Sequence, residues 1–588
     1  MSFVNKIHTY LFSRLKLIGT RKMTSKSTKP QVSTINNIVQ EEVSLKGAKD
    51  RLKKIFYTGL NSVKPHKIIQ NKVTFKNNEL CIDGTVLTLK ERVYLVGFGK
   101  AVMGMAIAIE KLLKNQLIKG IVSIPRGLKS KIWENVDNDS FPLLTGVIDY
   151  RENSLNNQPD DDTLIVTQEI INLAKSLTEK DTLIVLISGG GSALCSMPHP
   201  SITSEEKLNI CKKLFNSGAD IKEVNLIRQK LSMVKAGGLA KIAYPAQVIG
   251  LILSDIIGDP VELIASGPTV YSVRDPEIIE TILKKYDLLD KVEDNLKHIL
   301  LERESNEDKL FIDKIDNKDQ FLHVNNFIIG NNSLAIANAK IETIRQSLNP
   351  IVLCNNIEGL VSEVSLMYSE LCQLICEAWS KVISKEEFQE ALKNHQGLSW
   401  LSGRANEIYQ VLEVTEGQGL VLIAGGEPTI IVKGSGKGGR NQELALTFSF
   451  DWYKAVMNNS KLNPYDVLFL SAGTDGQDGP TDATGAFGYA GINFSIVNSQ
   501  QVVNNRQVNE KNNTYLEAKV ESVSLENVLK NNDSYSFYSW FKEGDDLLKT
   551  GFTGTNVMDL HLIYIKKRQC KCLNEIEKEN SKEEHCKC

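Results

Sequence analysis

The feature that most constrains this chain is the stretch 181–196, which reads D-T-L-I-V-L-I-S-G-G-G-S-A-L-C-S. Leu183–Ile187 is apolar without polar alternation and stops abruptly at Ser188, which predicts a strand buried on both faces that ends in a loop. Three glycines let an anion approach the loop amides, and Ser188 and Ser192 add hydroxyl donors. An anion-binding loop is the functional interpretation, and a tight strand-to-helix turn without a ligand is the alternative.

The same pattern recurs along the chain. Five more apolar runs stop at Gly, Ser, Ala, Asp, Asn or Lys, and they are Val93–Val96, Val248–Leu253, Phe327–Ile329, Leu420–Ile423 and Val467–Leu470. In open α/β sheets, ligands bind outside the carboxyl ends of the strands. The repetition therefore predicts an α/β fold with one site assembled from several loops.

Length and charge exclude some classes of protein. The chain has 588 residues, too many for a single core, so we expect two domains with extensions. A formal net charge of -2 leaves no basic excess for nucleic-acid binding. No apolar run reaches the roughly 18 residues that a membrane span needs. An anionic substrate must therefore be met by local lysines and arginines.

The two ends of the chain differ in composition from the rest. Residues 1–40 contain seven Lys or Arg and no Asp or Glu, which is typical of a mitochondrial presequence, with a disordered basic extension as the alternative. A second start at Met23 would give a cytosolic form. The tail 567–588 holds four cysteines whose spacing fits zinc sites poorly, so we predict a disordered tail rather than a zinc clip. The other six cysteines are expected to be free thiols.

A glycine turn follows the strand predicted at Val93. Gly97-x-Gly99-x4-Gly104 resembles a dinucleotide-binding fingerprint, but its spacing is off. The next predicted strand, Gly120–Ile124, is followed by no acidic residue that would hold a ribose. Lys100, at the start of the helix predicted over Ala101–Leu113, is better explained as a cation that faces a phosphate.

Two further cations lie near a strand that ends in acidic residues. Arg228 and Lys235 are seven residues apart, which predicts that they share one face of a helix within Glu223–Ala240. The following strand ends in Asp255, so we expect this helical face to contact an anionic ligand. An ordinary solvated surface is the alternative.

Earlier in the chain, Pro142–Asp162 is polar and is predicted to be a lid or entry loop.

The second dense region begins at Leu420. Thr429–Val432 is predicted to be a return strand, and 434–443 a mobile glycine loop that enters a helix with Arg440 and Asn441 at its start, where an anion can bind. Asp475 lies among glycines, which suits Mg²⁺ held partly through water and substrate phosphates, with turn capping as the alternative. The Asn-rich stretch 493–532 is predicted to be an enlarged surface loop.

Taken together, these loops resemble those of D-glycerate kinases of the MOFRL type, in particular the animal members. The resemblance covers about Lys46–Ile565 and is carried by Gly97–Ala101, Leu186–Leu194, Ile252–Pro268, Gly425–Pro428, Gly438–Glu443, Ala472–Gly476 and Thr553–Val557. Bacterial members usually have a His-Pro segment before the Pro-Asp that corresponds to Pro159-Asp160. This chain has no histidine there, so no role for that histidine is transferred.

The resemblance implies a fold and an activity. The fold is a two-domain α/β protein, with a Rossmann-like N-terminal domain that has a mostly parallel sheet and a smaller α/β C-terminal MOFRL domain. The expected bounds are 44–320 and 416–566, joined by a connecting α/β segment, 321–415. The activity is ATP- and Mg²⁺-dependent phosphorylation of D-glycerate in the cleft between the domains, and the resemblance favours 2-phosphoglycerate over 3-phosphoglycerate.

Phosphoryl transfer needs positioning and charge neutralisation, and we assign roles accordingly. Lys100, Arg440 and Asp255 are the expected catalytic residues, and either Arg228 or Lys235 is expected to hold the substrate carboxylate. Asp475 and Asp255 are candidates for Mg²⁺ ligation or for the base, and the sequence leaves both roles open. The expected phosphate or nucleotide contacts are Gly99, Ser188, Gly189, Gly190, Gly191, Ser192, Gly438, Gly439 and Asn441.

Two other functions fit parts of the sequence. The Gly97–Gly104 turn suggests an NAD(P)-dependent hydroxypyruvate reductase, but none of the eight histidines lies in the glycine loops to relay a proton. A non-catalytic sugar-acid or nucleotide sensor is the second alternative. The expected partners are D-glycerate and ATP, without nucleic acid or membrane, and a homodimer is a further expectation. Localisation is expected to be cytoplasmic or mitochondrial, the latter favoured for the full-length chain.

Overall fold

The structure is a computed structural model that describes residues 32–130, 146–154, 158–272, 275–301, 318–415, 417–493 and 524–568. The described residues from Leu45 onward belong to one compact unit. Most of the predicted presequence, parts of the predicted lid, most of the Asn-rich stretch and nearly all of the cysteine-containing tail lie outside the described residues.

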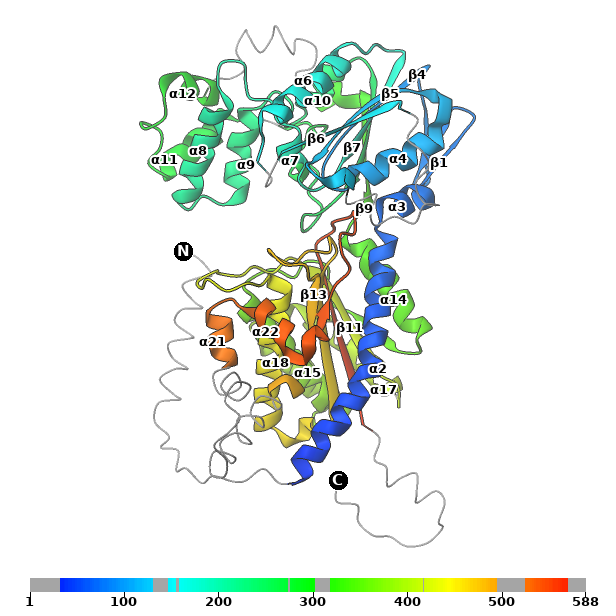
Figure 1. The fold of residues 1–588 in the computed structure, drawn as a ribbon, viewed down its shortest axis with the longest axis vertical. Helices are drawn as coiled ribbons and strands as arrows, with labels where there is room; N and C mark the ends of the chain where they lie inside the picture. Colours follow the sequence, from blue (N-terminus) through cyan, green and yellow to red (C-terminus); the bar gives the residue numbers. More distant parts are fainter. Residues whose placement is uncertain are drawn as a thin grey trace, which may run out of the picture. The chain divides into compact units, whose positions relative to one another are not determined.

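The first sheet has six parallel strands in the order β6-β5-β4-β7-β8-β9 (Figure 1). The strands are β4 Arg92–Phe98, β5 Leu117–Pro125, β6 Ile148–Asn153, β7 Asp181–Ile187, β8 Gln247–Leu253 and β9 Val324–Gly330. Every residue of β7 is buried, because β4 and β8 flank it and helices cover both faces. The apolar run Leu183–Ile187 is therefore part of a central strand, as predicted.

Helices pack on the two faces of this sheet. On one face, α4 (Val102–Leu113) and α3 (Pro65–Lys72) contribute buried side chains to a core shared with β4. On the other face, α6 (Asp161–Lys175) and α10 (Gly238–Ala243) pack on β7 and β8. Asp160 caps α6 by accepting from the Thr163 amide at 2.9 Å. The first domain is therefore a three-layer α/β arrangement, as the resemblance implied.

The second sheet is mixed, in the order β10-β11-β15-β12-β13-β14. Its strands are β10 Asn349–Val352, β11 Leu420–Gly426, β12 Tyr465–Gly473, β13 Gly485–Gly488, β14 Leu547–Leu548 and β15 Asp559–Lys567. The last strand of the described chain, β15, lies between β11 and β12 and runs antiparallel to both. The carboxyl ends of β11 and β12 therefore lie at the same edge, on either side of the first residue of β15.

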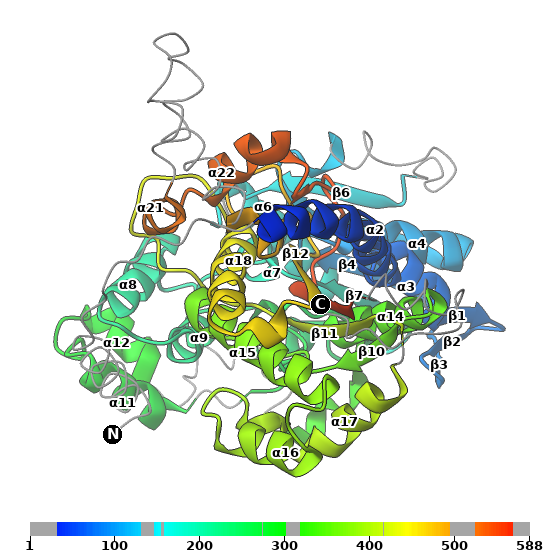
Figure 2. The same cartoon turned by 90° about the horizontal axis from the view of Figure 1, so that it is seen from below.

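Helices α15 (Val361–Trp379) and α18 (Arg440–Asn458) pack against each other over this sheet (Figure 2). Helix α14 (Asn332–Arg345) packs on β10 and β11, and α2 (Val32–Ser62) brings Gly59 against Ala335 and Leu560. The other helices are α7 Gly191–Leu194, α8 Ser204–Asn216, α9 Ile221–Lys230, α11 Pro276–Lys285, α12 Asp294–Leu301, α16 Lys385–Asn394, α17 Ala405–Val414, α21 Leu525–Lys530 and α22 Ser534–Trp540. A separate sheet, β1-β2-β3, is built from Val73–Lys76, Glu79–Ile82 and Thr85–Thr88.

The segment predicted to connect the domains contributes to both sheets. Its strand β9 pairs with β8, whereas β10 pairs with β11. At the start of α14, the Asn332 amide group donates to the carbonyls of Val557 (2.8 Å) and Asp559 (2.9 Å). The chain thus passes from the first sheet to the second at the N-terminus of α14, where it is fastened to the start of β15.

Three local predictions were wrong. Thr429–Val432 is no return strand, because β10 and β15 already occupy both edges of β11, and only Thr429 forms an isolated bridge, with Leu360. Helix α9 ends at Lys230, so Arg228 and Lys235 do not share a helical face. Part of the predicted lid is β6, which lies at the edge of the sheet. Several of its residues are polar and partly exposed, so the sequence shows no apolar run that would indicate a strand.

Gly426, at the carboxyl end of β11, tests how tightly this edge is packed. Its φ is +149°, and a Cβ there would overlap the backbone of Ile357. We expect Gly426→Ala to lower the free energy of unfolding by more than about 3 kcal/mol in urea titrations. Gly84→Ala is the matched control, because Gly84 also has a positive φ but nothing lies within 4 Å, so only about 1–2 kcal/mol should be lost. Equal losses would contradict the packing argument.

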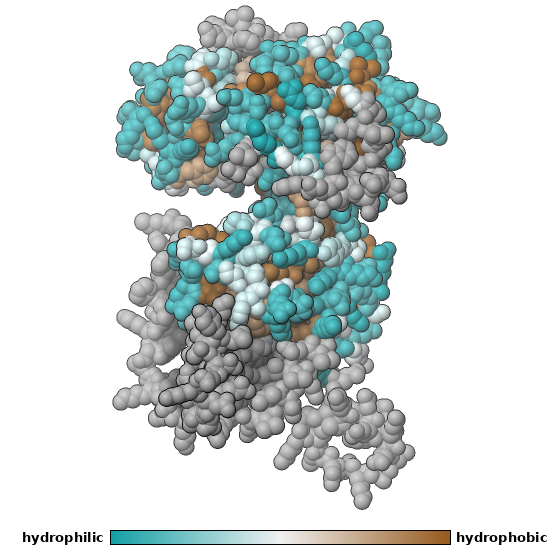
Figure 3. All heavy atoms as spheres, viewed as in Figure 1, coloured by the Kyte–Doolittle hydropathy of each residue, from teal (hydrophilic) through white to brown (hydrophobic). Residues whose placement is uncertain are grey.

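The surface resembles that of an ordinary globular protein. On the face drawn in Figure 3, hydrophilic residues predominate and hydrophobic ones occur in small scattered groups. Within the described ranges, no helix combines the length and apolar character needed to cross a membrane.

Candidate functional site

Three neighbouring strands of the first sheet deliver polar residues to one place. In the sheet register, Phe98 of β4 lies beside Ile187 of β7, which lies beside Ile252 of β8. The loops that follow therefore meet: the Lys100 amide donates to the Gly189 carbonyl at 2.9 Å, and a Cβ at Gly189 would overlap the Asp255 carboxylate. The structure thus brings Lys100, the triple-glycine loop and Asp255 together.

The triple-glycine loop is fixed by its own contacts. The Ser188 hydroxyl accepts from the Ala101 amide at 3.0 Å, and a Cβ at Gly99 would overlap Ser188. Gly190 has φ +80°, and the Lys100 side chain packs against it, its Cγ 3.2 Å from where a Cβ would lie. Within the described part of the chain, the amides of Gly189 and Gly190 donate to no protein acceptor. These two amides are thus available to an anion.

Asp255 is a partly buried carboxyl beside a lysine. Burial raises the pKa of Asp255 to about 6, although the charge of Lys100 opposes this rise. A carboxyl with a pKa this close to neutrality can accept a proton near physiological pH, as a general base must. Burial also destabilises the charged form of Asp255, so the ionised carboxylate lowers the stability of the folded protein.

The second sheet contributes an arginine held by two carboxylates. Arg440, the first residue of α18, donates from Nε to Asp559 Oδ2 at 2.6 Å and from Nη2 to Asp559 Oδ1 at 2.9 Å. Its Nη1 lies 2.9 Å from Glu427 Oε1. Burial alone would lower the pKa of Arg440, but Asp559 and Glu427 raise it well above its ordinary value. The guanidinium is therefore a permanently charged group in a fixed orientation.

Asp559 is a site residue that the sequence analysis missed. In the register of the second sheet it lies between Gly426 and Gly473, the last residues of β11 and β12. Gly473 leaves room for its carboxylate, because a Cβ there would lie 3.3 Å from Asp559 Oδ1. A carboxylate that opens an apolar strand gave the only sequence signal, and nothing local showed that this strand is central.

Asp475 and Glu427 complete the charges at this edge. Burial raises the pKa of Asp475, Asp559 raises it further, and Arg440 and Lys100 oppose the rise. Burial likewise raises the pKa of Glu427, with contributions from Asp559, Asp255 and Asp475. Charges from the loops of the first sheet therefore act on carboxylates from the second.

These carboxylates bear on the predicted Mg²⁺. Among the residues that the structure describes, no three His, Cys, Asp or Glu side chains come close enough to hold a metal by themselves. Asp255, Asp475 and Glu427 nevertheless offer hard oxygen donors. Burial raises the pKa of all three, and the charges of Asp255 and Asp475 raise that of Glu427 further. Mg²⁺ in phosphoryl-transfer sites typically uses one or two carboxylates together with water and phosphate oxygens, so the donor set fits this ion.

The N-terminus of α18 is already capped by Asp478. Asp478 accepts from the amides of Asn441 (3.0 Å) and Gln442 (2.8 Å), and a Cβ at Gly439 would overlap it. Burial raises the pKa of Asp478 to about 6, and these two amides oppose the rise. The Asn441 side chain accepts from Ser471 Oγ at 2.6 Å. The contacts of Asn441 and Gly439 are therefore structural ones, and their predicted role in phosphate binding remains a prediction.

The glycine loop before α18 has a packing role. A Cβ at Gly434, Gly436 or Gly438 would overlap a residue of the segment 531–534. Asn532 accepts from the amides of Lys433 (2.8 Å) and Gly434 (3.1 Å). The loop lies along this segment, which explains its glycines by close approach rather than by the mobility predicted from sequence.

The two cations predicted to hold the substrate carboxylate lie in different surroundings. Lys235 is 2% exposed, and its Nζ donates to the Ser192 carbonyl at 2.9 Å. Burial lowers the pKa of Lys235 to about 7, and the charge of Lys207 lowers it further. The Arg228 guanidinium lies 5.5 Å from the centre of the Phe215 ring. Lys235 thus adjoins the triple-glycine loop, whereas these contacts link Arg228 to α8.

Asp255 gives a prediction about stability and pH. Because its pKa is about 6 when folded and 3.8 ordinarily, the folded state binds the proton more tightly, and the free energy of unfolding falls as pH rises through this window. We expect Asp255→Asn to be more stable than the wild type at pH 7.5, by up to about 3 kcal/mol, and roughly half as much at pH 5. Urea titrations at both pH values measure this difference, and a constant or negative difference would contradict it.

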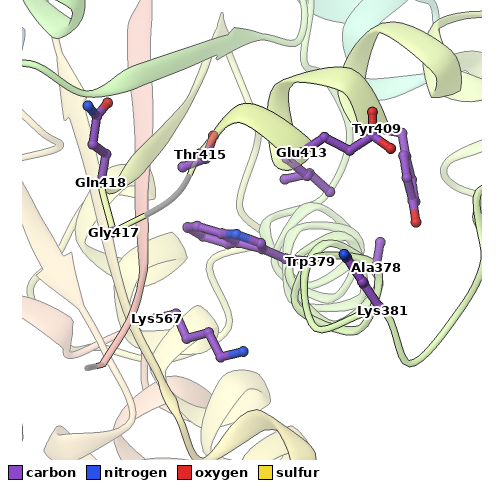
Figure 4. A pocket seen from close by; sticks show the side chains of 10 residues that line it. Ala378, Trp379, Lys381, Tyr409, Glu413, Thr415, Gly417, Gln418 and Lys567 are labelled. Carbon is purple, nitrogen blue, oxygen red and sulfur yellow. The ribbon is translucent and has the colours of Figure 1, made fainter. Parts of the chain in front are cut away.

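A pocket of about 450 Å³ lies elsewhere in the second domain (Figure 4). The Trp379 ring lies at its centre, with Glu413 and Tyr409 of α17 on one side and Lys567 at the end of β15 on the other. The pocket is at the end of the second sheet opposite to Gly426 and Asp559. It is therefore separate from the candidate site.

Comparisons with known proteins agree with this geometry. Residues 51–301 match a domain of unknown function, DUF4147, and residues 420–559 match the MOFRL family. A glycerate kinase from Rattus norvegicus is 39% identical over 518 residues, which are 87% of this chain and 92% of the relative. A glycerate 2-kinase from Pyrococcus horikoshii is 27% identical over 87% of this chain and 96% of its own length.

Solved structures include a similar protein. The crystal structure of a glycerate kinase from Thermotoga maritima matches with a TM-score of 0.63 and 26% identity, and it covers 89% of this chain and 100% of that one. The two family-model matches include the loops that follow β4, β7, β8, β11 and β12. By sequence, family model and fold, this chain is an enzyme that belongs to the glycerate kinase family of the MOFRL type.

Proposed function

We propose that this protein phosphorylates D-glycerate with ATP at the strand ends where the loops of the two sheets meet. The observation that carries the proposal is the geometry of the triple-glycine loop, whose Gly189 and Gly190 amides are open beside Lys100 and Asp255. A phosphoryl group in transfer is anionic and needs positive charge and amide donors around it. We infer the substrate, glycerate, from the relatives that are named glycerate kinase.

The residues have distinct roles in this proposal. The free amides of Gly189 and Gly190 and the Ser192 hydroxyl bind phosphate oxygens, and Lys100 neutralises their charge. Arg440, oriented by Asp559, stabilises the charge that develops on the transferring group. Asp255 accepts the proton of the attacking glycerate hydroxyl, for which its raised pKa is suitable. Arg228 or Lys235 remains the candidate for contact with the substrate carboxylate.

Mg²⁺ would be held by Asp475, with Glu427 nearby, and when bound it would neutralise phosphate charge, which leaves Asp255 free to act as the base. The protein's own contribution is to orient these carboxylates: Asp475 Oδ1 accepts from the Gln477 amide at 3.1 Å. Mn²⁺ can replace Mg²⁺ as a paramagnetic probe. Electron paramagnetic resonance of Mn²⁺ bound to the wild-type protein tests this assignment, and the measurement does not depend on catalytic activity. Asp475→Asn should lose that signal.

We further propose 2-phosphoglycerate as the product, because a relative that covers most of this chain is named a glycerate 2-kinase. Phosphorus NMR after incubation with ATP, Mg²⁺ and D-glycerate distinguishes the two monophosphates. A 3-phosphoglycerate signal would contradict the proposed product, whereas the proposed kinase activity would still stand.

A coupled assay tests the function itself. ADP formation that depends on D-glycerate is the expected result. Oxidation of NAD(P)H with hydroxypyruvate and no ADP formation would identify a reductase, and ligand binding without turnover would identify a sensor. Either outcome contradicts the proposal.

For localisation, we propose mitochondrial import of the full-length chain, based on the seven basic and no acidic residues in 1–40. A fluorescent fusion of the full chain should enter mitochondria, and a fusion starting at Met23 should remain in the cytosol. Cytosolic fluorescence of both fusions would contradict import.

A further inference from the structure

A strained turn lies directly against the triple-glycine loop. Ala265, Ser266 and Gly267 have φ values of +50°, +62° and +63°, three successive residues in the left-handed region. Alanine and serine rarely adopt this conformation, because their Cβ atoms approach the backbone too closely. Backbone strain of this kind persists only where the surroundings enforce it.

Hydrogen bonds from a second turn enforce this conformation. The Ala236 amide donates to the Ser266 carbonyl at 2.9 Å, and the Gly237 amide donates to the Gly267 carbonyl at 2.7 Å. Ala236 and Gly237 also have positive φ values, +49° and +79°. From α9, the side-chain amide of Gln229 donates to the Glu262 carbonyl at 3.0 Å. The turn is thus held from two sides.

The consequence of this turn is the placement of one hydroxyl. Ser266 is fully buried, and its Oγ lies 2.8 Å from Ser192 Oγ in the triple-glycine loop. The adjacent Ala265 packs on the same loop, because a Cβ at Gly191 would come within 2.9 Å of the Ala265 Cβ. Lys235 holds the Ser192 carbonyl at 2.9 Å. Ser192 is therefore fixed through both its hydroxyl and its carbonyl.

We propose that Ser266 is a positioning residue whose hydroxyl donates to Ser192 Oγ and thereby directs the Ser192 proton toward a bound phosphate. A hydroxyl has one proton and two acceptor lone pairs, so Ser192 can accept from Ser266 and still donate to a ligand. The left-handed turn sets the direction of the Ser266 side chain. This inference rests on the proposed function, since it takes the loop Ser188–Ser192 as the phosphate site.

Two variants at Ser266 separate the hydroxyl from the backbone. Ser266→Ala keeps a Cβ in the left-handed turn and removes only the hydroxyl, whereas Ser266→Gly also relieves the strain. We expect kcat/KM for ATP to fall about tenfold in both, mainly through KM, as for one lost hydrogen bond to a charged ligand. A Ser266→Gly variant with the KM of the wild type would overturn the proposal.

A double variant tests whether the two hydroxyls act together. If Ser266 works through Ser192, then Ser192→Ala combined with Ser266→Ala should lose no more than Ser192→Ala alone. If the loss of kcat/KM in the double variant equals the product of the losses in the two single variants, the proposal is wrong. Ser365→Ala is the matched control: Ser365 is also fully buried, and its hydroxyl donates to Asp451 at 2.6 Å outside the site. It should lower Tm and leave KM for ATP unchanged, and a KM change equal to that of Ser266→Ala would also count against the proposal.

The wild-type protein distinguishes the two levels of inference. If it forms no phosphoglycerate, the proposed function fails, and the same variants are then compared by calorimetric titration with ATP. If it is active and the Ser266 variants bind and use ATP like the wild type, only the positioning role fails.

Discussion

Arg440→Ala is expected to reduce kcat by about 10³-fold or more while leaving a folded protein, because arginines that stabilise a transferring phosphoryl group contribute about this much. The geometry supports a direct role, since two carboxylates fix a guanidinium that is already positively charged. Arg440→Lys should recover only a small part of the activity, because an ammonium cannot reproduce the planar fork. Steady-state kinetics of each purified variant measure the effect.

Arg92 provides the matched control for this experiment. It binds the buried Asp181 through the same two nitrogen atoms, Nε at 2.7 Å and Nη2 at 2.9 Å, at the opposite end of the first sheet. Arg92→Ala therefore removes an equivalent pair without touching the site, and it should lower Tm but keep kcat. A loss of no more than several-fold in Arg440→Ala, or equal losses in both variants, would refute the assignment of Arg440.

Lys100→Ala is expected to lower kcat by about 10²–10³-fold, because it removes a fixed positive charge from the loop that is proposed to bind phosphate. Lys100→Met is the better test of charge, since methionine keeps much of the apolar stem that packs on Gly190. Both variants should show the thermal transition of the wild type, which differential scanning calorimetry checks.

Lys180 is the control for Lys100. It directly precedes β7, so it lies at the other end of the strand that carries the glycine loop, and its side chain is 61% exposed. Lys180→Ala should change neither kcat nor KM. If Lys100→Met keeps more than a third of wild-type turnover, the ammonium has no catalytic role.

The sequence predicted the strands that lead to the candidate site, because apolar runs and the loops that end them are encoded locally. All six apolar runs that were predicted as strands are strands, from β4 to β12. Lys100 and Asp255 lie together in the structure because each follows such a run within a few residues, and parallel neighbours deliver their carboxyl ends to one edge.

What the sequence did not reveal depends on contacts between distant residues. The central place of β15 depends on pairing with β11 and β12, which begin 139 and 94 residues earlier (559 − 420 and 559 − 465). Nothing in the residues around Asp559 indicates this pairing. The capping of α18 by Asp478 and the packing of the glycine loop on 531–534 likewise join residues far apart in sequence.

The position of β15 has a consequence for how the enzyme is made. During translation, β11, β12 and Arg440 leave the ribosome well before residues 559–567, so the second sheet has a gap at its middle until β15 has been made. Until then, two long apolar strands have exposed edges that favour aggregation. A nascent chain that stalls before Asp559 has only Glu427 as a carboxylate partner for Arg440, so the guanidinium gains its full orientation when β15 closes the gap.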